Sequence, residues 1–428
     1  MTALSLSAEL TERSQARREI TARVFSPAIL AYAVSVVRDA ASRGAKCLYF
    51  LARDGYTLKR AAEQVCAVCG IDLECRYLYC SRLSLRTAEY FLDEDAYLKL
   101  LMNGCARLTK NTLFSRIQLN EEERAAVLAD IPWDNSDSDR IITPHEQAEL
   151  CRQLSESAVF CRIMDEKSKR AFEQTIDYFS SEGMLSEEAI YIVDSGWCGS
   201  VQQSISTLLK AAGAKQRVFG YYFGLFTAPG EVARNSRCFY FSPHKYAGRK
   251  ARFCNNLLEI ALYAPHPMTV GYKYSGGGIV PVFSEVSADD RENIVRELIS
   301  RDIEEYCREN AAQYMKLSED KLVNTAKKSI VPFMMGPTPE EAEAFTEVMF
   351  CDDSSNCYLL PVSERAEAAD FGRLTFPYSL ANRFLHRAGP DKYFVWFGGS
   401  AALSGLKLPK LWTAEHILYR YFRFLIFR

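Results

Sequence analysis

Short apolar runs alternate with segments of helical periodicity in the first half of this chain. Residues 47–52 and 75–80 are dominated by apolar side chains and predict buried strands, and residues 56–68 between them carry apolar side chains at helical spacing. A strand, a helix and a second strand at this spacing form a βαβ unit with a right-handed crossover and parallel strands. Two further apolar runs, at 189–194 and 217–225, extend the predicted parallel sheet.

Helical sequence surrounds and interrupts this sheet. The stretch that follows the second strand turns helical and polar, which indicates a helical module inserted into the sheet domain. Further helices are expected at 8–45, 166–182, 255–262, 288–316 and 338–350, with a hairpin at 271–283. The predicted division is N-terminal helices at 1–45, an α/β core at 46–83 and 165–245, an inserted helical cap at 84–164, and a mixed, largely helical C-terminal region at 246–428.

Composition excludes several classes of protein. The 428 residues are 48% apolar and 25% charged with a net charge of −2, which is typical of a globular protein and gives no basic excess for nucleic acid. The charged N-terminus lacks the apolar core of a signal peptide, and no apolar stretch approaches the ~20 residues of a membrane-spanning helix. We therefore expect a cytoplasmic protein whose 14 cysteines are mostly small buried thiols. Cys66 and Cys69 have zinc-knuckle spacing, but no second pair completes the ligand set.

Polar residues stand where the predicted strands end. Asp54 follows the first strand, Ser81 the second and Asp194 the third, with Lys167 or Lys169 opening the helix before the third. Because ligands of open α/β sheets bind beyond the carboxyl ends of the strands, these residues predict one shared site. The competing interpretation is structural, since a strand-end Asp or Ser often caps the next helix.

The segment after Asp194 favours an anion. Gly196-Trp197-Cys-Gly199 brackets a turn that opens a helix with Ser200 and Gln202, so backbone N–H groups and the positive end of a helix dipole are available there. Arg53 and Arg82, beside Asp54 and Ser81, add cations that suit phosphate or carboxylate. Packing is the structural alternative for Trp197.

These motifs resemble those of haloacid dehalogenase-like (HAD-like) phosphohydrolases. The chain resembles more closely a group of predicted HAD-like proteins found with bacterial surface-polysaccharide synthesis, through Phe50–Tyr56, Leu78–Arg82 and Val193–Gln202. The helix from Asn255 to Glu259 also resembles that group, and the likeness covers most of 25–285. It implies a Rossmann-like parallel sheet with an inserted cap, and a hydrolase acting on a phosphorylated sugar or related phosphoester.

The resemblance also implies roles for individual residues. In such enzymes a strand-end Asp attacks phosphorus, an Asp two residues on exchanges a proton with the leaving group, and Mg²⁺ screens the charge. Here Asp54 and Asp194 would be catalytic and hold Mg²⁺. The expected phosphate- and substrate-binding residues are Arg53, Tyr56, Ser81, Arg82, Lys167, Lys169, Gly196, Trp197, Gly199, Ser200 and Gln202.

The chain departs from the enzyme pattern in two places. It reads Ala52-Arg53-Asp54-Gly55-Tyr56, so either Asp54 is the nucleophile and Tyr56 replaces the acid, or Ala52 replaces the nucleophile. After Asp194, Cys198 or Gly199 stands in place of the second metal-binding acid. Two alternatives therefore stay open: a non-catalytic binding or scaffold module of a glycan-assembly system, and a transferase of the same pathway.

Two features of the last part of the chain bear on the site and on partners. Glu259 and His266 could complete a pocket near Tyr272, although a lone His is more often structural. Residues 413–428 form an aromatic-rich basic segment, typical either of a terminal helix docked on the core or a partner, or of peripheral membrane contact.

Overall fold

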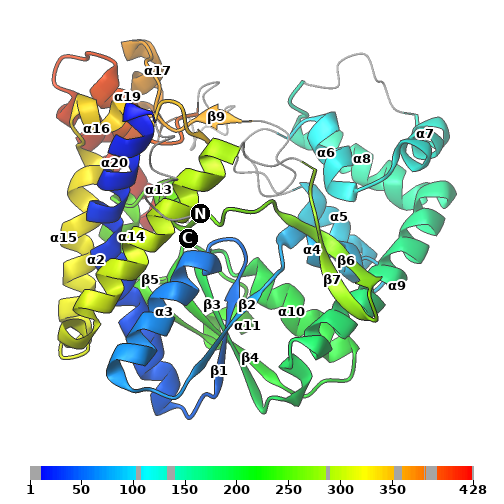
Figure 1. The fold of residues 1–428 in the computed structure, drawn as a ribbon. Helices are drawn as coiled ribbons and strands as arrows, with labels where there is room; N and C mark the ends of the chain where they lie inside the picture. The colour runs from blue at the N-terminus through cyan, green and yellow to red at the C-terminus, as the bar shows by residue number, and fades with distance from the viewer. Residues whose placement is uncertain are drawn as a thin grey trace.

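A five-stranded parallel sheet forms the centre of the protein (Figure 1), in the order β2-β1-β3-β4-β5. The computed structural model describes residues 11–102, 108–132, 140–285, 290–350, 359–379, 381 and 393–426. The strands are β1 (Cys47–Leu51), β2 (Glu74–Leu78), β3 (Ala189–Trp197), β4 (Arg217–Leu225) and β5 (Ser236–Phe241). The predicted parallel α/β core is confirmed, and β5 is an additional edge strand that the sequence pattern did not predict.

Alternation along the strands separates two apolar cores. In β1, Leu48 and Phe50 pack on one face of the sheet, while Tyr49 and Leu51 pack on the other. The first face is covered by α2 (Glu12–Ser42) and α3 (Gly55–Cys69), and α14 (Asp290–Tyr314) and α15 (Glu319–Met335) pack on these helices within the same core. The second face is covered by α9 (Ala158–Ser181) and α10 (Ser200–Ala211). The sheet thus lies between two helical layers, and its strands are apolar on both sides for that reason.

Helix α2 is long and apolar enough to cross a membrane. In its most apolar window 78% of the residues are buried inside the protein, where the helix packs on α14, α15 and α3. This burial is typical of a core helix, and it explains why the N-terminal region has few polar positions along the middle of the helix.

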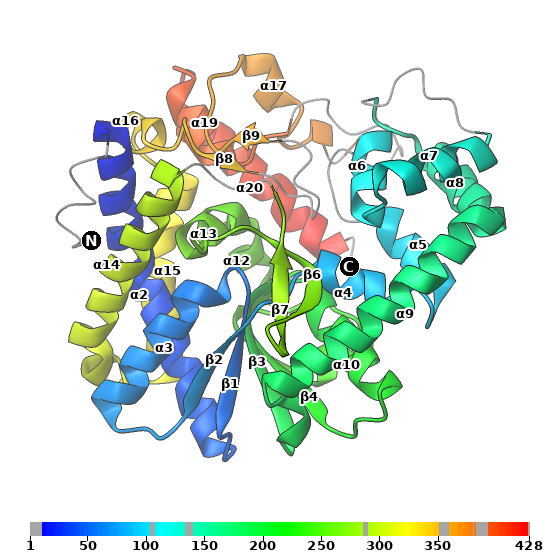
Figure 2. The same ribbon diagram turned by 45° about the vertical axis from the view of Figure 1, so that its right-hand side comes forward.

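The insertion between β2 and β3 is helical, as the sequence predicts. It comprises α4 (Arg82–Glu89), α5 (Glu94–Met102), α6 (Lys110–Ile117), α7 (Glu121–Asp130), α8 (Pro144–Glu156) and the first turns of α9. Its buried side chains form a cluster of their own, with Leu113, Leu150 and Phe160 among its fully buried members. Figure 2 shows these helices at one side of the sheet.

One boundary of the insertion differs from the prediction. Helix α9 begins at Ala158 and not near residue 166, because the Ser157 hydroxyl accepts a hydrogen bond from the Phe160 N–H and caps it. Asp130 accepts a hydrogen bond from the same hydroxyl at 2.6 Å. Lys167 and Lys169 therefore lie inside a long helix and do not open one.

The C-terminal region continues around the sheet. The antiparallel hairpin β6 (Thr269–Ser275) and β7 (Gly278–Phe283) packs on α4 and α9. The helix predicted at 338–350 is wrong beyond its first turns: α16 (Pro339–Glu343) ends early, and β8 (Met349–Phe350) pairs with β9 (Leu360–Pro361). The Thr338 capping box starts α16, while the aromatic and β-branched residues after it favour an extended chain. The remaining elements are η1 (Met184–Ser186), α11 (Gly230–Arg234), α12 (Ala247–Ala251), α13 (Asn255–Leu262), α17 (Ala368–Gly372), α19 (Phe397–Leu403) and α20 (Pro409–Ile426).

Candidate functional site

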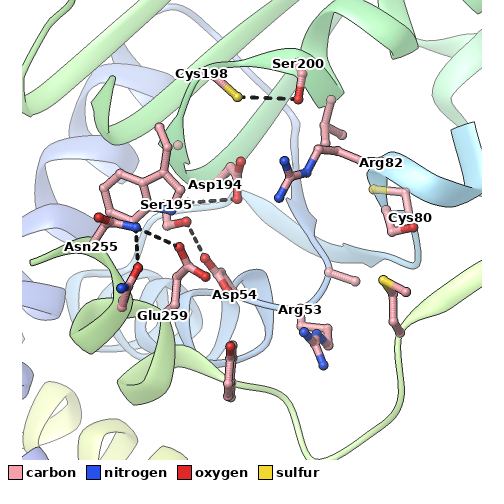
Figure 3. A pocket seen from close by; sticks show the side chains of 18 of the residues that line it. Arg53, Asp54, Cys80, Arg82, Asp194, Ser195, Cys198, Ser200, Asn255 and Glu259 are labelled. Carbon is pink, nitrogen blue, oxygen red and sulfur yellow. Dashed lines mark hydrogen bonds between the residues drawn. The ribbon is translucent and has the colours of Figure 1, made fainter. Parts of the chain in front are cut away.

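A cavity of about 240 Å³ lies at the carboxyl ends of the central strands. Residues 52–54 after β1, 80–82 after β2 and 194–198 at the end of β3 line it, and α13 closes it with Asn255 and Glu259. Figure 3 shows Asp54, Asp194 and Glu259 directed into the same space. The predicted meeting of distant strand ends is thus present in the fold.

Ser195 connects the two strand-end aspartates. Its hydroxyl donates a short hydrogen bond to the Asp54 carboxylate, and its backbone N–H donates one to Asp194 Oδ1 at 2.9 Å (Figure 3). Tyr32, from α2, donates a hydrogen bond to the Asp194 carbonyl at 2.9 Å and fixes the backbone of β3 there. The Asp54 side chain makes no capping hydrogen bond to α3, so the capping interpretation of Asp54 is wrong. Its carboxylate is directed at the cavity.

The three cavity carboxyls hold protons more tightly than ordinary carboxyls. Desolvation raises the pKa of Asp54, against the hydrogen bond from Ser195 and the charges of Arg53 and Arg82. Desolvation and the charge of Asp54 raise the pKa of Asp194 to about 8. The same two causes, in the same order, raise the pKa of Glu259 to about 8. Near neutral pH the cavity therefore carries less negative charge than three carboxylates would give.

Two guanidinium groups supply positive charge at the cavity. The charge of Arg82 opposes the raised pKa of Asp54, Asp194 and Glu259 alike, so it faces all three. Arg53 lies over the Tyr263 ring at 5.0 Å from its centroid. Among the residues that the structure describes, neither Arg53 nor Arg82 forms an ion pair, so both remain available to an anion.

The end of β3 and the turn after it have backbone geometry that glycine permits. Gly196 has φ of +118°, and a Cβ at this position would collide with the carbonyl oxygen of Gly224 on β4. Gly199 precedes α10, and no side chain caps the N–H groups of that helix. Ser200, in the first turn of α10, lines the cavity together with Gly196 and Trp197. The N-terminus of α10 thus faces the cavity without a side-chain cap.

Some predicted site residues serve the fold. Ser81 caps α4 by accepting hydrogen bonds from the N–H groups of Leu83 and Ser84, and its hydroxyl donates to the Thr269 carbonyl at 2.6 Å. The capping interpretation of Ser81 is therefore confirmed, although Ser81 also lines the cavity. Gln202 is buried and donates to the carbonyls of Val218 and Asn235. Gln202 and Gly199 do not line the cavity.

The structure does not bring Tyr56, Lys167 or Lys169 to the cavity. The Tyr56 hydroxyl donates to Glu297 Oε2 on α14 at 2.8 Å. Lys167 pairs with Glu123 of α7 at 2.5 Å, inside the helical insertion, and Lys169 pairs with Asp165 on the surface of α9. The cations at the cavity are arginines.

Glu259 and His266 have different surroundings. Glu259 accepts a 3.4 Å hydrogen bond from Asn255 and lines the cavity beside Asp54. His266 lies among aromatic rings, with Tyr77 Oη 2.8 Å from its Nε2, and is structural. The signal that could identify Glu259 is its position on the apolar helix 255–262, where a lone carboxyl needs a polar surrounding.

The donor set fits one kind of metal site. Asp54 and Asp194 are held together through Ser195, and among the described residues no group of three or more His, Cys, Asp and Glu side chains is placed to enclose a metal. Mg²⁺ commonly binds through one or two carboxylates, several waters and substrate phosphate. The two aspartates fit Mg²⁺ in that form and do not fit an ion enclosed by protein ligands alone. The eleven cysteines in the described residues are free thiols, and none joins such a group.

Comparison with known proteins adds no family assignment. No protein-family model matches the chain, and no curated protein sequence matches it significantly. The function has to be argued from the cavity itself.

Proposed function

We propose that this protein is a HAD-like phosphoester hydrolase that acts on a phosphorylated sugar or a related phosphoester of surface-glycan metabolism. The observation that carries the proposal is the meeting of Asp54, Asp194 and Arg82 in one cavity at the carboxyl edge of a parallel sheet. Asp54 and Asp194 stand at the positions of the first and last HAD-like motifs that the sequence resembles, and Arg82 supplies the cation expected from the lysine. Nucleophile, metal-binding acid and phosphate-binding cation are thereby brought within reach of one phosphoryl group.

Asp54 is the proposed nucleophile. One of its carboxylate oxygens attacks phosphorus, the bond from phosphorus to the leaving oxygen breaks, and an aspartyl phosphate forms. The Ser195 hydrogen bond orients the carboxylate and favours its ionised form, which is the form that attacks. Water then attacks the phosphorus, the bond to Asp54 breaks, and inorganic phosphate leaves.

Glu259 is the proposed general acid and base. In its protonated form it gives a proton to the leaving oxygen, and as a carboxylate it takes a proton from the attacking water. Its pKa of about 8 keeps it protonated at neutral pH before the first step. This role replaces the missing acid two residues after Asp54, where Tyr56 is directed at Glu297 and away from the cavity.

Asp54 and Asp194 would hold Mg²⁺, which, when bound, neutralises charge on the phosphoryl oxygens. Binding of the cation requires both carboxyls to be ionised, so metal affinity is expected to rise with pH. Arg82 and the open N-terminus of α10 bind the phosphoryl group from the opposite side of the cavity. Trp197 and Tyr263 supply aromatic surface for the remainder of the substrate.

A non-catalytic anion-binding module is the second candidate. The raised pKa values of Asp194 and Glu259 favour it, because protonated carboxyls beside two arginines bind an anion without a metal. A glycan-pathway transferase using the same aspartyl phosphate would need an acceptor other than water. Turnover and its products separate these functions.

The test is release of phosphate from a panel of sugar phosphates, with Mg²⁺ and with a chelator. A hydrolase releases inorganic phosphate only in the presence of Mg²⁺. A binding module shows saturable binding of the same compounds, with or without Mg²⁺, and releases none. A transferase releases inorganic phosphate slowly when water is the only acceptor, and it moves the phosphoryl group to a glycan acceptor when one is added.

A further inference from the structure

Helix α20 has an apolar stripe on the side that faces solvent. Leu411, Leu418, Tyr421 and Leu425 are 54, 40, 37 and 39% exposed. Their spacing of seven, three and four residues places all four on one face of the helix. A helix that only docks on a protein core presents polar residues on this face, so the stripe needs another explanation.

The opposite face of α20 is already occupied by the protein. Thr413 is buried, the His416 ring stacks on Phe397 with centroids 4.0 Å apart, and Phe424 stacks on Phe226 at 5.5 Å. These contacts fix the rotation of the helix about its axis. Thr413, His416 and Phe424 thus form the docking face of α20. The stripe cannot turn inward without breaking the contacts of this face.

Neighbouring residues widen the apolar surface. Leu408 and Ile426 at the two ends of α20 are exposed, and so is Tyr246, which precedes α12. Helix α12 packs along α20, and Gly248 lies against the Tyr421 ring. Leu411, Leu418, Tyr421, Leu425 and Tyr246 together form the α20 apolar surface.

The surroundings of the α20 apolar surface are basic. From residue 407 to 426 the exposed basic residues are Lys407, Lys410 and Arg423, against a single acid, Glu415. From 245 to 252 Lys245 and Arg252 are exposed, Arg249 is half-buried, and there is no acid. Apolar and aromatic residues bordered by Lys and Arg are complementary to an anionic lipid surface.

We propose that α20 and α12 bind the surface of an anionic lipid bilayer, with the stripe inserted at the level of the headgroups and the basic residues against lipid phosphates. A second copy of the chain is a poorer occupant. A two-fold interface places the same patch of both subunits face to face, so the basic borders would oppose each other.

The docking face connects this surface to the cavity. Phe226 contacts both Phe424 of α20 and Trp197, which lines the cavity, with centroids 5.5 and 5.9 Å apart. Membrane binding would thus hold the cavity close to the bilayer. The membrane proposal does not depend on the proposed hydrolase activity, since it rests on the exposed face of α20.

The experiment is co-sedimentation of the full chain with vesicles of phosphatidylcholine, with and without phosphatidylglycerol. We expect binding to the anionic vesicles, at least tenfold weaker binding to phosphatidylcholine alone, and weakening by salt. Leu418→Glu with Leu425→Glu should abolish binding, because both side chains are exposed and their replacement spares the docking face. Val68→Glu, at an exposed apolar position on α3, is the matched control and should bind as the wild type does.

Two outcomes would overturn the proposal. One is the absence of binding to anionic vesicles by a folded wild-type chain, judged by its circular dichroism. The other is a concentration-dependent dimer that Leu418→Glu with Leu425→Glu dissociates while vesicle binding is unchanged, which would assign the stripe to a second copy.

Discussion

A carboxyl that is paired within the fold and the carboxyls of the cavity differ in the direction of their pKa shifts. Asp39, on the α2 side of the sheet, is desolvated, yet hydrogen bonds from Arg43 and Tyr221 and the charge of Arg237 lower its pKa. Asp194 and Glu259 in the cavity have pKa values raised to about 8. Asp39 is matched by cations within the fold, whereas no ion pair is formed by Asp54, Asp194 or Glu259 among the described residues. Carboxyls that hold the fold together are paired, and carboxyls left without a pair mark the place where a ligand is expected.

The largest expected effect on activity comes from replacing the cavity carboxyl Asp54. Asp54→Asn should lower phosphate release by about 10³-fold or more, because it removes the attacking oxygen. Its stability should be equal to or above that of the wild type, since a desolvated acid becomes a neutral amide.

The matched control is Asp39→Asn. It removes the carboxylate that pairs with Arg43 and one of the two that pair with Arg237, and it should reduce the free energy of unfolding by about 1–3 kcal/mol while turnover persists. If Asp39→Asn abolished turnover and Asp54→Asn only destabilised the chain, the assignment of the two groups would be reversed.

Glu259→Gln should have the next largest effect, and one that depends on the substrate. For a substrate with a poor leaving group, such as a sugar phosphate, we expect a loss of about 10²-fold. For an aryl phosphate whose leaving group needs no proton, the loss in formation of the aspartyl phosphate should be small. The rate of that first step is measured by the burst of leaving group in rapid mixing. An equal loss for both substrates would remove Glu259 from the acid role and leave the nucleophile assignment intact.

The pH dependence of stability should differ between the two groups. Because Asp194 and Glu259 bind protons more tightly in the folded state than in the unfolded chain, the metal-free protein should lose stability as pH rises from about 5 through 8. Asp39 behaves in the opposite way: its contribution to the stability of the folded protein is lost as pH falls below the ordinary carboxyl range. Urea unfolding across this range, in wild type and Asp194→Asn, measures the slope. A slope above pH 6 that is identical in both chains would contradict the raised pKa of Asp194.

The smallest expected effect on turnover is that of replacing Lys167, which we compare with the replacement of Arg82. Lys167→Met should change turnover less than about twofold, because Lys167 pairs with Glu123 in the insertion and does not line the cavity. Arg82→Met should raise the KM by at least about tenfold, since it removes the cation that faces all three carboxyls. A large loss in Lys167→Met with none in Arg82→Met would restore the phosphate-binding role that the sequence order predicts for the lysine.

The sequence predicted the parallel sheet and the meeting of Asp54 with Asp194 because both follow from local patterns and one general rule. Apolar runs identify the strands, and the carboxyl ends of parallel strands share an edge. The lysine prediction depended on where α9 begins, and the Ser157 cap that moves this start by two turns is a tertiary arrangement with Asp130. The neighbours of Glu259 are set by the packing of α13 against the sheet, which no local periodicity encodes.

Some elements could not be predicted for related reasons. The edge strand β5 is short and begins one residue after α11, and its pairing with β4 includes a register shift between Tyr222 and Gly224. The end of α16 depends on packing of Phe345 and Phe350, both buried in the main core. Where tertiary contacts decide a boundary, periodicity over a few residues is insufficient.

The most direct test of the central claim is chemical trapping of the intermediate. A sugar phosphate that is turned over in the presence of Mg²⁺ is quenched in acid during the steady state, and the peptides are analysed by mass spectrometry. The account predicts a phosphoryl group on the peptide that contains Asp54, and its absence in Asp54→Asn. A phosphoryl group on any other residue, or phosphate release by Asp54→Asn at the wild-type rate, would contradict the account.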